Sequence, residues 1–142
     1  MVSLKDGAFR VVNGAHRAVY RLSRGRLLGR AAGMPVVILT TTGRRTGRCR
    51  RTMLTTPVSD GDRVVLVASK GGAERHPAWF HNLVANPDVL VTQGARTRRM
   101  RARVAGADER AELWPRIVQA YAGYAGYQQK TDREIPVVVV ES

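Results

Sequence analysis

Hydrophobic residues recur at two different spacings along the chain. Over residues 4–28 they recur at helical intervals, which predicts an amphipathic helix. From Pro35 onward, short apolar and β-branched runs are separated by glycine and proline, a pattern typical of strands. We therefore expect two parts: a basic N-terminal amphipathic helix over residues 1–30 and a β domain over residues 31–142.

The β domain contains six apolar segments of strand length. Asp60-Gly61 is a strong hairpin signal, so we expect the first three segments to form a meander. The last segment is almost continuously apolar, which indicates burial on both faces. The predicted fold is mainly β with flanking helices, a six-stranded antiparallel sheet curled into a small barrel. The strands are expected at residues 36–42, 48–58, 63–69, 88–93, 96–104 and 135–140, with a short helix at 78–85 and a longer one from about Glu109.

Two local patterns give sharper expectations. Asp108 is placed to cap the longer helix, which Pro115 would interrupt unless it lies in the first turn or at a kink. In the strand at 96–104, arginines alternate with apolar residues, which predicts a half-buried strand with a basic outer face. The outward residues are Arg99, Arg101 and Arg103, and the inward residues are Met100, Ala102 and Val104.

The charge balance is strongly basic. The 142 residues include 24 basic and 11 acidic ones, a formal net charge of +13. A field of that strength favours an anionic partner, whether nucleic acid, an anionic membrane or a polyanionic small molecule. All but three of the basic residues are arginine, which binds phosphate and carboxylate with two parallel hydrogen bonds. A GC-rich genome would produce the same bias.

The N-terminal segment carries seven basic residues and a single acid, Asp6. Such a helix either lies in the headgroup region of an anionic membrane or packs on the domain with its basic face in solvent. The single cysteine, Cys49, excludes an internal disulfide, and no segment approaches the roughly 18 apolar residues of a spanning helix. The expected location is the cytoplasm, with the inner face of the cell membrane as a further contact.

The turn at residues 42–47 is the first candidate for binding chemistry. Its two glycines favour exposed backbone N–H groups, and five arginines lie within or next to it. This composition suits phosphate and carboxylate groups. A basic hairpin turn in solvent has the same composition, so both interpretations stay open here.

Two further segments are candidates for a small-molecule pocket. Ser69 and Lys70 end a buried strand, and the glycines that follow let a flat ring approach the backbone closely. Tyr121, Tyr124 and Tyr127 recur every three residues among alanines and glycines, which predicts an aromatic wall with hydroxyl tips. The alternative for these tyrosines is a stripe of core residues.

Complete catalytic sets are missing from the sequence. It has no GxGxxG or Walker spacing, no triad context, and no metal-ligand spacing among His16, His76 and His81. Trp79 suits stacking on a cofactor and, equally, filling the core. We infer that an enzyme with this sequence takes its reactive group from a cofactor.

In their order along the chain, the segments from about residue 35 to the C-terminus resemble the deazaflavin-dependent nitroreductase family, whose members use coenzyme F420. The resemblance implies a split β-barrel like that of flavin-binding reductases. It also implies an oxidoreductase that passes a hydride from reduced coenzyme F420 to a menaquinone-like quinone or a nitroaromatic acceptor. The matching stretches are Leu39–Gly47, Val67–Glu74, Pro77–Trp79, Asn82–Leu83, Ala85–Pro87, Glu112–Pro115, the three tyrosines, and Thr131–Arg133 with Ile135–Pro136.

The resemblance also implies roles for individual residues. Those expected to hold the phosphate and oligoglutamate tail of the coenzyme are Arg44, Arg45, Arg50 and Lys70. The walls of the ring site are expected to be Ala68, Ser69, Ala78 and Trp79. The acceptor pocket is expected to be formed by Ser69, Tyr121, Tyr124 and Tyr127. A branch of the family that reduces membrane quinones also carries a basic N-terminal helix.

The sequence departs from the family pattern at two places. Thr55 or Thr56 stands where close relatives have an aromatic residue facing the substrate, which leaves the acceptor open, and Cys49 stands where proline is common. Two other functions remain as alternatives. A nucleic-acid-binding barrel would explain the net charge, although the aromatic residues do not lie among the basic strand residues. The second alternative function is a related barrel that binds a flavin or another ligand without turnover.

Overall fold

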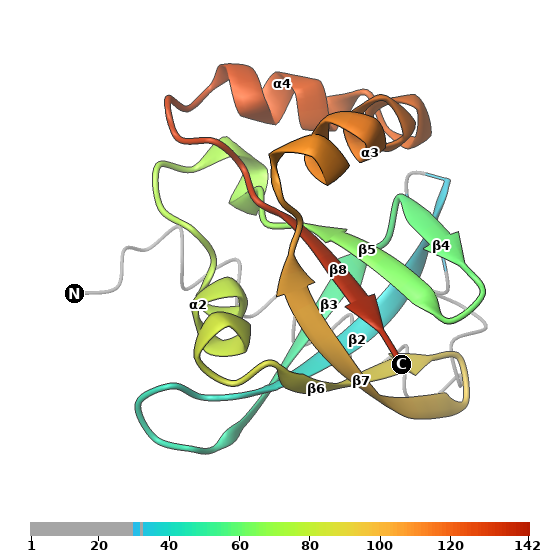
Figure 1. Ribbon diagram of the computed structural model, residues 1–142, viewed down its shortest axis with the longest axis vertical. Helices are drawn as coiled ribbons and strands as arrows, with labels where there is room; N and C mark the ends of the chain where they lie inside the picture. Colours follow the sequence, from blue (N-terminus) through green and yellow to red (C-terminus); the bar gives the residue numbers. More distant parts are fainter. Residues whose placement is uncertain (1–29, 32) are drawn as a thin grey trace.

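The computed structural model describes residues 30–31 and 33–142, so the predicted N-terminal helix lies outside the described residues. Within this part, five strands are followed by two short helices, two further strands, two C-terminal helices and a last strand (Figure 1). The strands are β1 (Arg30–Ala31), β2 (Met34–Thr42), β3 (Cys49–Thr55), β4 (Val58–Asp60), β5 (Arg63–Val67), β6 (Asp88–Gln93), β7 (Arg96–Val104) and β8 (Val137–Glu141). The helices are the 3₁₀ turn η1 (Lys70–Gly72), α2 (Ala78–Ala85), α3 (Ala107–Ala120) and α4 (Gly123–Gln129).

The strands form one antiparallel sheet that curls into a half-barrel, which confirms the predicted fold class (Figure 1). Its order is β1-β2-β6-β7-β8-β5-β4, and β3 pairs with β2 outside this path. The six predicted strands are all present. The two additional strands, β1 and β4, have only two and three residues, too few to produce an alternating pattern.

The expected meander of the first three strands is correct in its two hairpins, β2–β3 and, at Asp60-Gly61, β4–β5, but wrong in pairing the third strand with β3. β2 and β3 pair as predicted, but β5 pairs with β4 and β8 instead of β3. The segment predicted as one strand over residues 48–58 ends at Thr55, because Pro57 has no N–H to donate to a ladder. Within the described residues, β3 therefore pairs on one edge only, and the sheet is split between β3 and β5.

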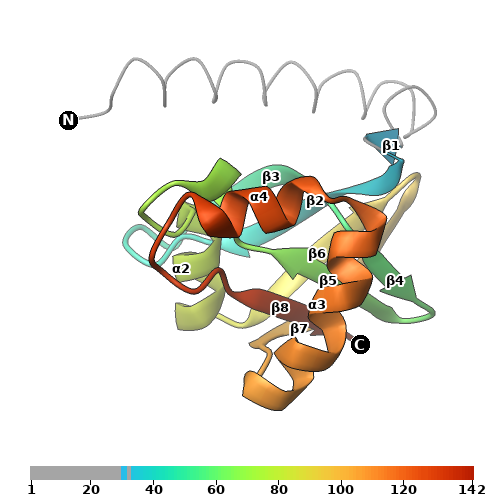
Figure 2. The same ribbon diagram turned by 90° about the horizontal axis from the view of Figure 1, so that it is seen from above.

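Buried side chains form one layer on each face of the curled sheet. The inner layer combines residues of five strands with Trp79, Phe80 and Leu83 of α2. The outer layer lies between β5, β8 and the two C-terminal helices, which cross over that face (Figures 1 and 2). Residues 137–140 of β8 are 0% exposed and contribute alternately to both layers, which confirms the predicted burial on both faces.

β7 shows the predicted alternation with one exception. Its three outward arginines are exposed, while Met100 and Ala102 are buried in the inner layer. Val104, expected to face inward, is 46% exposed, because the strand ends there and the chain turns away toward α3.

The C-terminal helical region differs from the prediction in two respects. The expected single long helix is two helices, because Tyr121 has extended backbone angles and ends α3. The expected cap at Asp108 is wrong: the N-cap is Gly106, without a side-chain hydrogen bond. Asp108 instead lies in the first turn, where its negative charge interacts favourably with the positive end of the helix dipole. Pro115 lies inside α3.

Candidate functional site

The turn that follows β5 has an unusual backbone. Lys70, Gly71 and Gly72 have φ angles of 46°, 65° and 83°, three left-handed residues in succession. Glycine adopts this region without strain, whereas Lys70 does not, so its conformation must be held by its surroundings. The N–H of Gly72 donates to the Ser69 carbonyl at 2.9 Å, which closes the turn.

Gly72 brings this turn against α4. A Cβ atom at Gly72 would lie 2.8 Å from the Tyr127 carbonyl oxygen, so only glycine allows this approach. The predicted site residue Ser69, at the start of the turn, is 7% exposed. The structure therefore places the Ser69 turn beside the helix that carries Tyr124 and Tyr127.

The three predicted tyrosines form one cluster. The rings of Tyr121 and Tyr124 meet edge to face at 5.3 Å, and those of Tyr124 and Tyr127 at 6.0 Å. Tyr124 is 5% exposed within the outer layer, whereas Tyr121 and Tyr127 are partly buried at its margin. Tyr124 thus packs as a core residue, while the role of Tyr121 and Tyr127 in an acceptor pocket stays a prediction.

The environment favours the protonated form of Tyr124 and Tyr127. Burial raises the pKa of Tyr124, against the opposing effect of its hydrogen bond with Thr55. A hydrogen bond with Tyr121, together with burial, raises the pKa of Tyr127 to about 12. A protonated phenol can donate a hydrogen bond to an oxygen on a ligand, so the cluster suits charge stabilisation better than proton abstraction.

The structure distinguishes Thr55 from Thr56. The Thr55 hydroxyl lies 2.8 Å from the Tyr124 hydroxyl, so this residue belongs to the phenol cluster. Thr56 is 0% exposed, and its hydroxyl lies within hydrogen-bonding distance of the carbonyls of Val58 and Val65. Thr56 is thus a structural residue that joins the end of β3 to β4 and β5.

The arginine turn lies at the other end of β3. Its backbone closes by two hydrogen bonds, from the Gly43 N–H to the Arg48 carbonyl and from the Gly47 N–H to the Gly43 carbonyl, and Gly47 adopts a φ of 71°. The Arg44 N–H donates to the side chain of Asn82, a buried residue of α2 that also donates to Thr41. The sequence pointed to Asn82 only through the family motif, because a polar residue on a short helix has no distinctive pattern.

Four arginines of this turn have no acidic partner among residues 33–142. Arg44, Arg45, Arg48 and Arg50 are exposed, and the ion pairs within residues 33–142 join other arginines to the acids. Exposed guanidinium groups without carboxylate partners are available to an anionic ligand.

The arginine turn and the phenol cluster are linked by β3. Thr55 at its end contacts Tyr124, and Cys49 at its start follows the turn. Six residue steps at about 3.3 Å each separate the two ends by about 20 Å. A ligand that contacts both groups must therefore be elongated, with its anionic portion at the arginine end.

Three predicted wall residues have different exposures. Ala68 is 0% exposed and Trp79 is 6% exposed, and both side chains belong to the inner layer. Ala78, at the start of α2, is exposed. Their packing accounts for Ala68 and Trp79 as core residues, and their role toward a ring stays a prediction.

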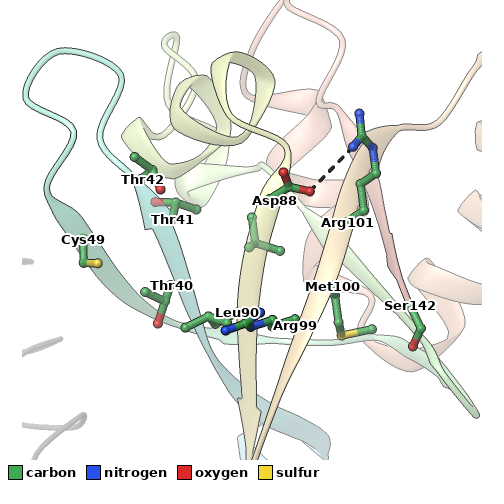
Figure 3. A pocket seen from close by; sticks show the side chains of 11 residues that line it. Thr40, Thr41, Thr42, Cys49, Asp88, Leu90, Arg99, Met100, Arg101 and Ser142 are labelled. Carbon is green, nitrogen blue, oxygen red and sulfur yellow. Dashed lines mark ion pairs between the residues drawn. The ribbon is translucent and has the colours of Figure 1, made fainter.

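A separate hollow of about 520 Å³ lies over β2, β6 and β7 (Figure 3). Cys49 reaches it from the start of β3, and an ion pair of 3.6 Å joins Asp88 and Arg101 at its rim. None of the predicted site residues lines it, so we assign it no part in the site. Its lining residues are Thr40, Thr41, Thr42, Cys49, Asp88, Val89, Leu90, Arg99, Met100, Arg101 and Ser142.

Within the described part of the chain, no three His, Cys, Asp or Glu side chains come together as metal ligands. The rings of His76 and His81 lie 5.6 Å apart in a tilted arrangement beside Phe80, and burial lowers the pKa of both imidazoles. None of the described helices is long and apolar enough to cross a membrane.

The curled antiparallel half-barrel is the flavin-reductase-like fold of small F420-dependent oxidoreductases. The family described as F420H(2)-dependent quinone reductase matches residues 13–142. The chain belongs to this family, and its cofactor is coenzyme F420. The resemblance inferred from the sequence is thereby confirmed.

Individual relatives agree with this assignment. An F420H(2)-dependent quinone reductase of Mycobacterium tuberculosis is 42% identical over 129 residues, which cover 88% of this chain and 86% of the relative. The solved structure of an F420-H2 dependent reductase is 44% identical to this chain, with a TM-score of 0.68. The match covers 75% of this chain and 94% of the solved one. Another solved structure, described as a domain-swapped dimer, is 38% identical with a TM-score of 0.72, over 90% of this chain and 96% of its own.

Proposed function

We propose that this enzyme reduces a menaquinone-like quinone, with the coenzyme extended along β3. Its phosphate and oligoglutamate tail contact Arg44, Arg45 and Arg50, and its ring lies near Ser69 and the phenol cluster. The observation that carries the proposal is the placement of exposed guanidinium groups, without an acidic partner in the described part of the chain, and of protonated phenols at opposite ends of β3.

The residues present fit such a coenzyme. A phosphodiester and several carboxylates match a set of exposed arginines that have no acidic partner of their own among the described residues. Lys70 lies on the ring side, in the turn that packs on α4. Its ammonium group would neutralise an anionic atom between the tail and the ring.

When bound, the reduced coenzyme supplies the hydride. The chain itself contributes position and charge stabilisation. Ser69 offers a buried hydroxyl, and Tyr121 and Tyr127 offer phenol hydroxyls at the margin of the outer layer. Because the pKa of Tyr127 is about 12, this phenol keeps its proton and donates to negative charge that forms on the acceptor oxygen.

Thr55 bears on the choice of acceptor. Thr55 is one of the two threonines expected where the family resemblance implies an aromatic residue, and its hydroxyl lies 2.8 Å from that of Tyr124. A smaller side chain leaves more room next to the phenols, which favours a ring with a substituent, such as a menaquinone-like quinone. We propose nitroaromatic compounds as slower, secondary acceptors. Contact of the N-terminal segment with an anionic membrane stays a prediction.

Calorimetric titration with oxidised coenzyme F420 tests the tail contacts. We expect the double variant Arg44→Ser/Arg45→Ser to bind about tenfold more weakly or worse, because each charge-assisted hydrogen bond contributes about 1.5–3 kcal/mol. Its affinity should also depend less on salt concentration. Arg99→Ser is the matched control, since Arg99 is also exposed but lies on β7. Equal affinity of the double variant and the control would refute the tail contacts.

Turnover measurements test the acceptor. With saturating reduced coenzyme, we expect kcat/KM for a soluble menaquinone analogue to exceed that for a nitroaromatic compound. The reverse order would refute quinone as the preferred acceptor while leaving the coenzyme site intact. The comparisons give the nucleic-acid alternative no support, and the coenzyme's polyanionic tail accounts for a basic surface equally well.

A further inference from the structure

One guanidinium group holds the whole turn that contains Ser69. Arg133 donates from Nε to the Ala73 carbonyl at 2.8 Å, from Nη1 to the Ala68 carbonyl at 3.2 Å, and from Nη2 to the Ser69 carbonyl at 2.8 Å. These three carbonyls flank η1 on both sides, about sixty residues away from Arg133 in the sequence.

These contacts determine where the peptide N–H groups of the turn point. In a trans peptide the N–H is directed opposite to the carbonyl, and the chain has no cis peptide bond among the described residues. The carbonyls of Ala68 and Ser69 face Arg133, so the N–H groups of Ser69 and Lys70 face away from it. The same contacts hold the left-handed conformation of Lys70, which a lysine adopts only under constraint.

His76 completes the environment of this guanidinium group. Its Nδ1 atom lies 2.9 Å from Nη1 of Arg133, and its ring packs against Phe80 and His81. A neutral imidazole accepts this hydrogen bond through Nδ1, which fixes the plane of the guanidinium group. Within the described part of the chain the Arg133 guanidinium group makes no ion pair, and its hydrogen bonds join it to backbone carbonyls and to His76.

We propose that Arg133 is a positioning residue for the coenzyme ring, and that His76 orients Arg133. The guanidinium group holds the peptide groups of residues 68–70 so that the Ser69 N–H and hydroxyl are presented to the polar edge of the deazaflavin ring. This inference deepens the proposed function and rests on it for the identity of the ligand. It assigns the role to a residue that the sequence presented only as part of a family motif.

The first experiment measures the binding of oxidised coenzyme F420 by calorimetry, without turnover. We expect Arg133→Ala to lower the affinity about tenfold or more, which corresponds to about 1.4 kcal/mol per factor of ten. Added guanidinium ion at millimolar concentration should restore part of the loss. Arg133→Lys should not restore it, because an ammonium group cannot reach three carbonyls in one plane.

Arg110→Ala is the matched control. Arg110 also donates two hydrogen bonds to one backbone carbonyl, that of Ile135, and one to Gln128, but it does not touch the Ser69 turn. We expect its loss of thermal stability to resemble that of Arg133→Ala, while its coenzyme affinity stays within about twofold of the wild type. An equal loss of affinity in both variants would overturn the positioning role.

Hydrogen exchange tests the same contacts without any ligand. The N–H groups of Gly72 and Ala73 donate to the carbonyls of Ser69 and Lys70, so their exchange reports on the turn. We expect both amides to exchange about tenfold faster in Arg133→Ala than in the wild type, and at the wild-type rate in Arg110→Ala. If Arg133→Ala does not fold, His76→Phe serves instead. It removes one hydrogen-bond acceptor of Arg133 and should accelerate hydrogen exchange at both amides to a smaller extent. Unchanged exchange in a folded Arg133 or His76 variant would refute the proposal.

If the wild type fails to bind coenzyme F420, the proposed function fails, while hydrogen exchange still decides whether Arg133 holds the turn. If the wild type binds the coenzyme and Arg133→Ala binds it equally well, the positioning role alone fails. The two conclusions are therefore distinguishable.

Discussion

Gly123 allows the Tyr121 ring to lie over the first residue of α4. A Cβ atom at Gly123 would lie 2.3 Å from Cε2, 2.4 Å from Cζ and 2.6 Å from Oη of that ring. Ordinary van der Waals contact begins at 3.4 Å, so Gly123→Ala must displace the ring by about 1 Å or more. The ring is the end of a rotatable side chain and can move without a change in the backbone.

The effect on stability should be small. Alanine is favoured over glycine in a helix by about 0.5–1 kcal/mol, because glycine loses more backbone freedom on folding. Displacing the ring weakens the edge-to-face contact of Tyr121 with Tyr124, at 5.3 Å and 89°, which contributes about 0.5–1.5 kcal/mol. The two terms nearly cancel. We expect the free energy of unfolding to change by less than about 1 kcal/mol.

The effect on catalysis should be larger, because a misplacement of about 1 Å can lower a rate by about a hundredfold. With saturating reduced coenzyme F420, we expect kcat for a quinone to fall at least about tenfold in Gly123→Ala. Gly126→Ala is the matched control on the same helix, since a Cβ there meets nothing within 4 Å. Denaturant unfolding of both variants verifies that they remain folded.

Two outcomes would contradict this reasoning. If Gly123→Ala retains the wild-type kcat while a crystal structure shows the ring displaced, the Tyr121 phenol has no part in acceptor reduction. If Gly126→Ala loses as much activity as Gly123→Ala, the loss comes from the helix as a whole and not from the position of the ring.

Further predictions concern stability. Thr56→Val should destabilise the fold by about 1–3 kcal/mol, because it leaves buried carbonyls without their hydrogen-bond donor. Thr55→Val should lower the free energy of unfolding by less than about 1 kcal/mol. Urea unfolding of each variant measures both effects. Leu66→Ala should cost about 2–5 kcal/mol in the same assay, since Leu66 is 0% exposed in the inner layer. Burial lowers the pKa of His76, and the charge of Arg133 lowers it further. The stability that the neutral imidazole contributes is therefore fully present above the ordinary histidine pKa of about 6.5 and is lost as the pH falls below it. Melting temperature should therefore decline as pH falls below that value, and His76→Gln should reduce the decline.

Each of these predictions has a clear counter-result. Equal losses of stability for the two threonine variants would show that the Thr56 hydroxyl is not needed by β4 and β5. A Leu66→Ala variant as stable as the wild type would contradict the packing of the inner layer. The same acid-dependent decline in wild type and His76→Gln would assign the pH dependence to other groups.

Local features of the fold were predictable because they depend on neighbours in the sequence. The alternation of Arg99 with Met100 placed β7 correctly, and the apolar run at residues 137–140 predicted its burial on both faces. The break between α3 and α4 was not predictable, because Tyr121 carries no breaker signal of its own. With this extended backbone its ring lies against those of Tyr124 and Tyr127.

The sequence alone determined the charge of the chain, the positions of its turns, and the kinds of side chain available to a polyanionic cofactor. These properties follow from composition and from spacings of a few residues. Only the tertiary structure decided that β5 pairs with β8, that Thr55 and not Thr56 meets the phenols, and that Arg133 holds the turn at Ser69. Such contacts join residues about sixty or more positions apart. Their choice depends on how the whole sheet closes, which local patterns do not encode.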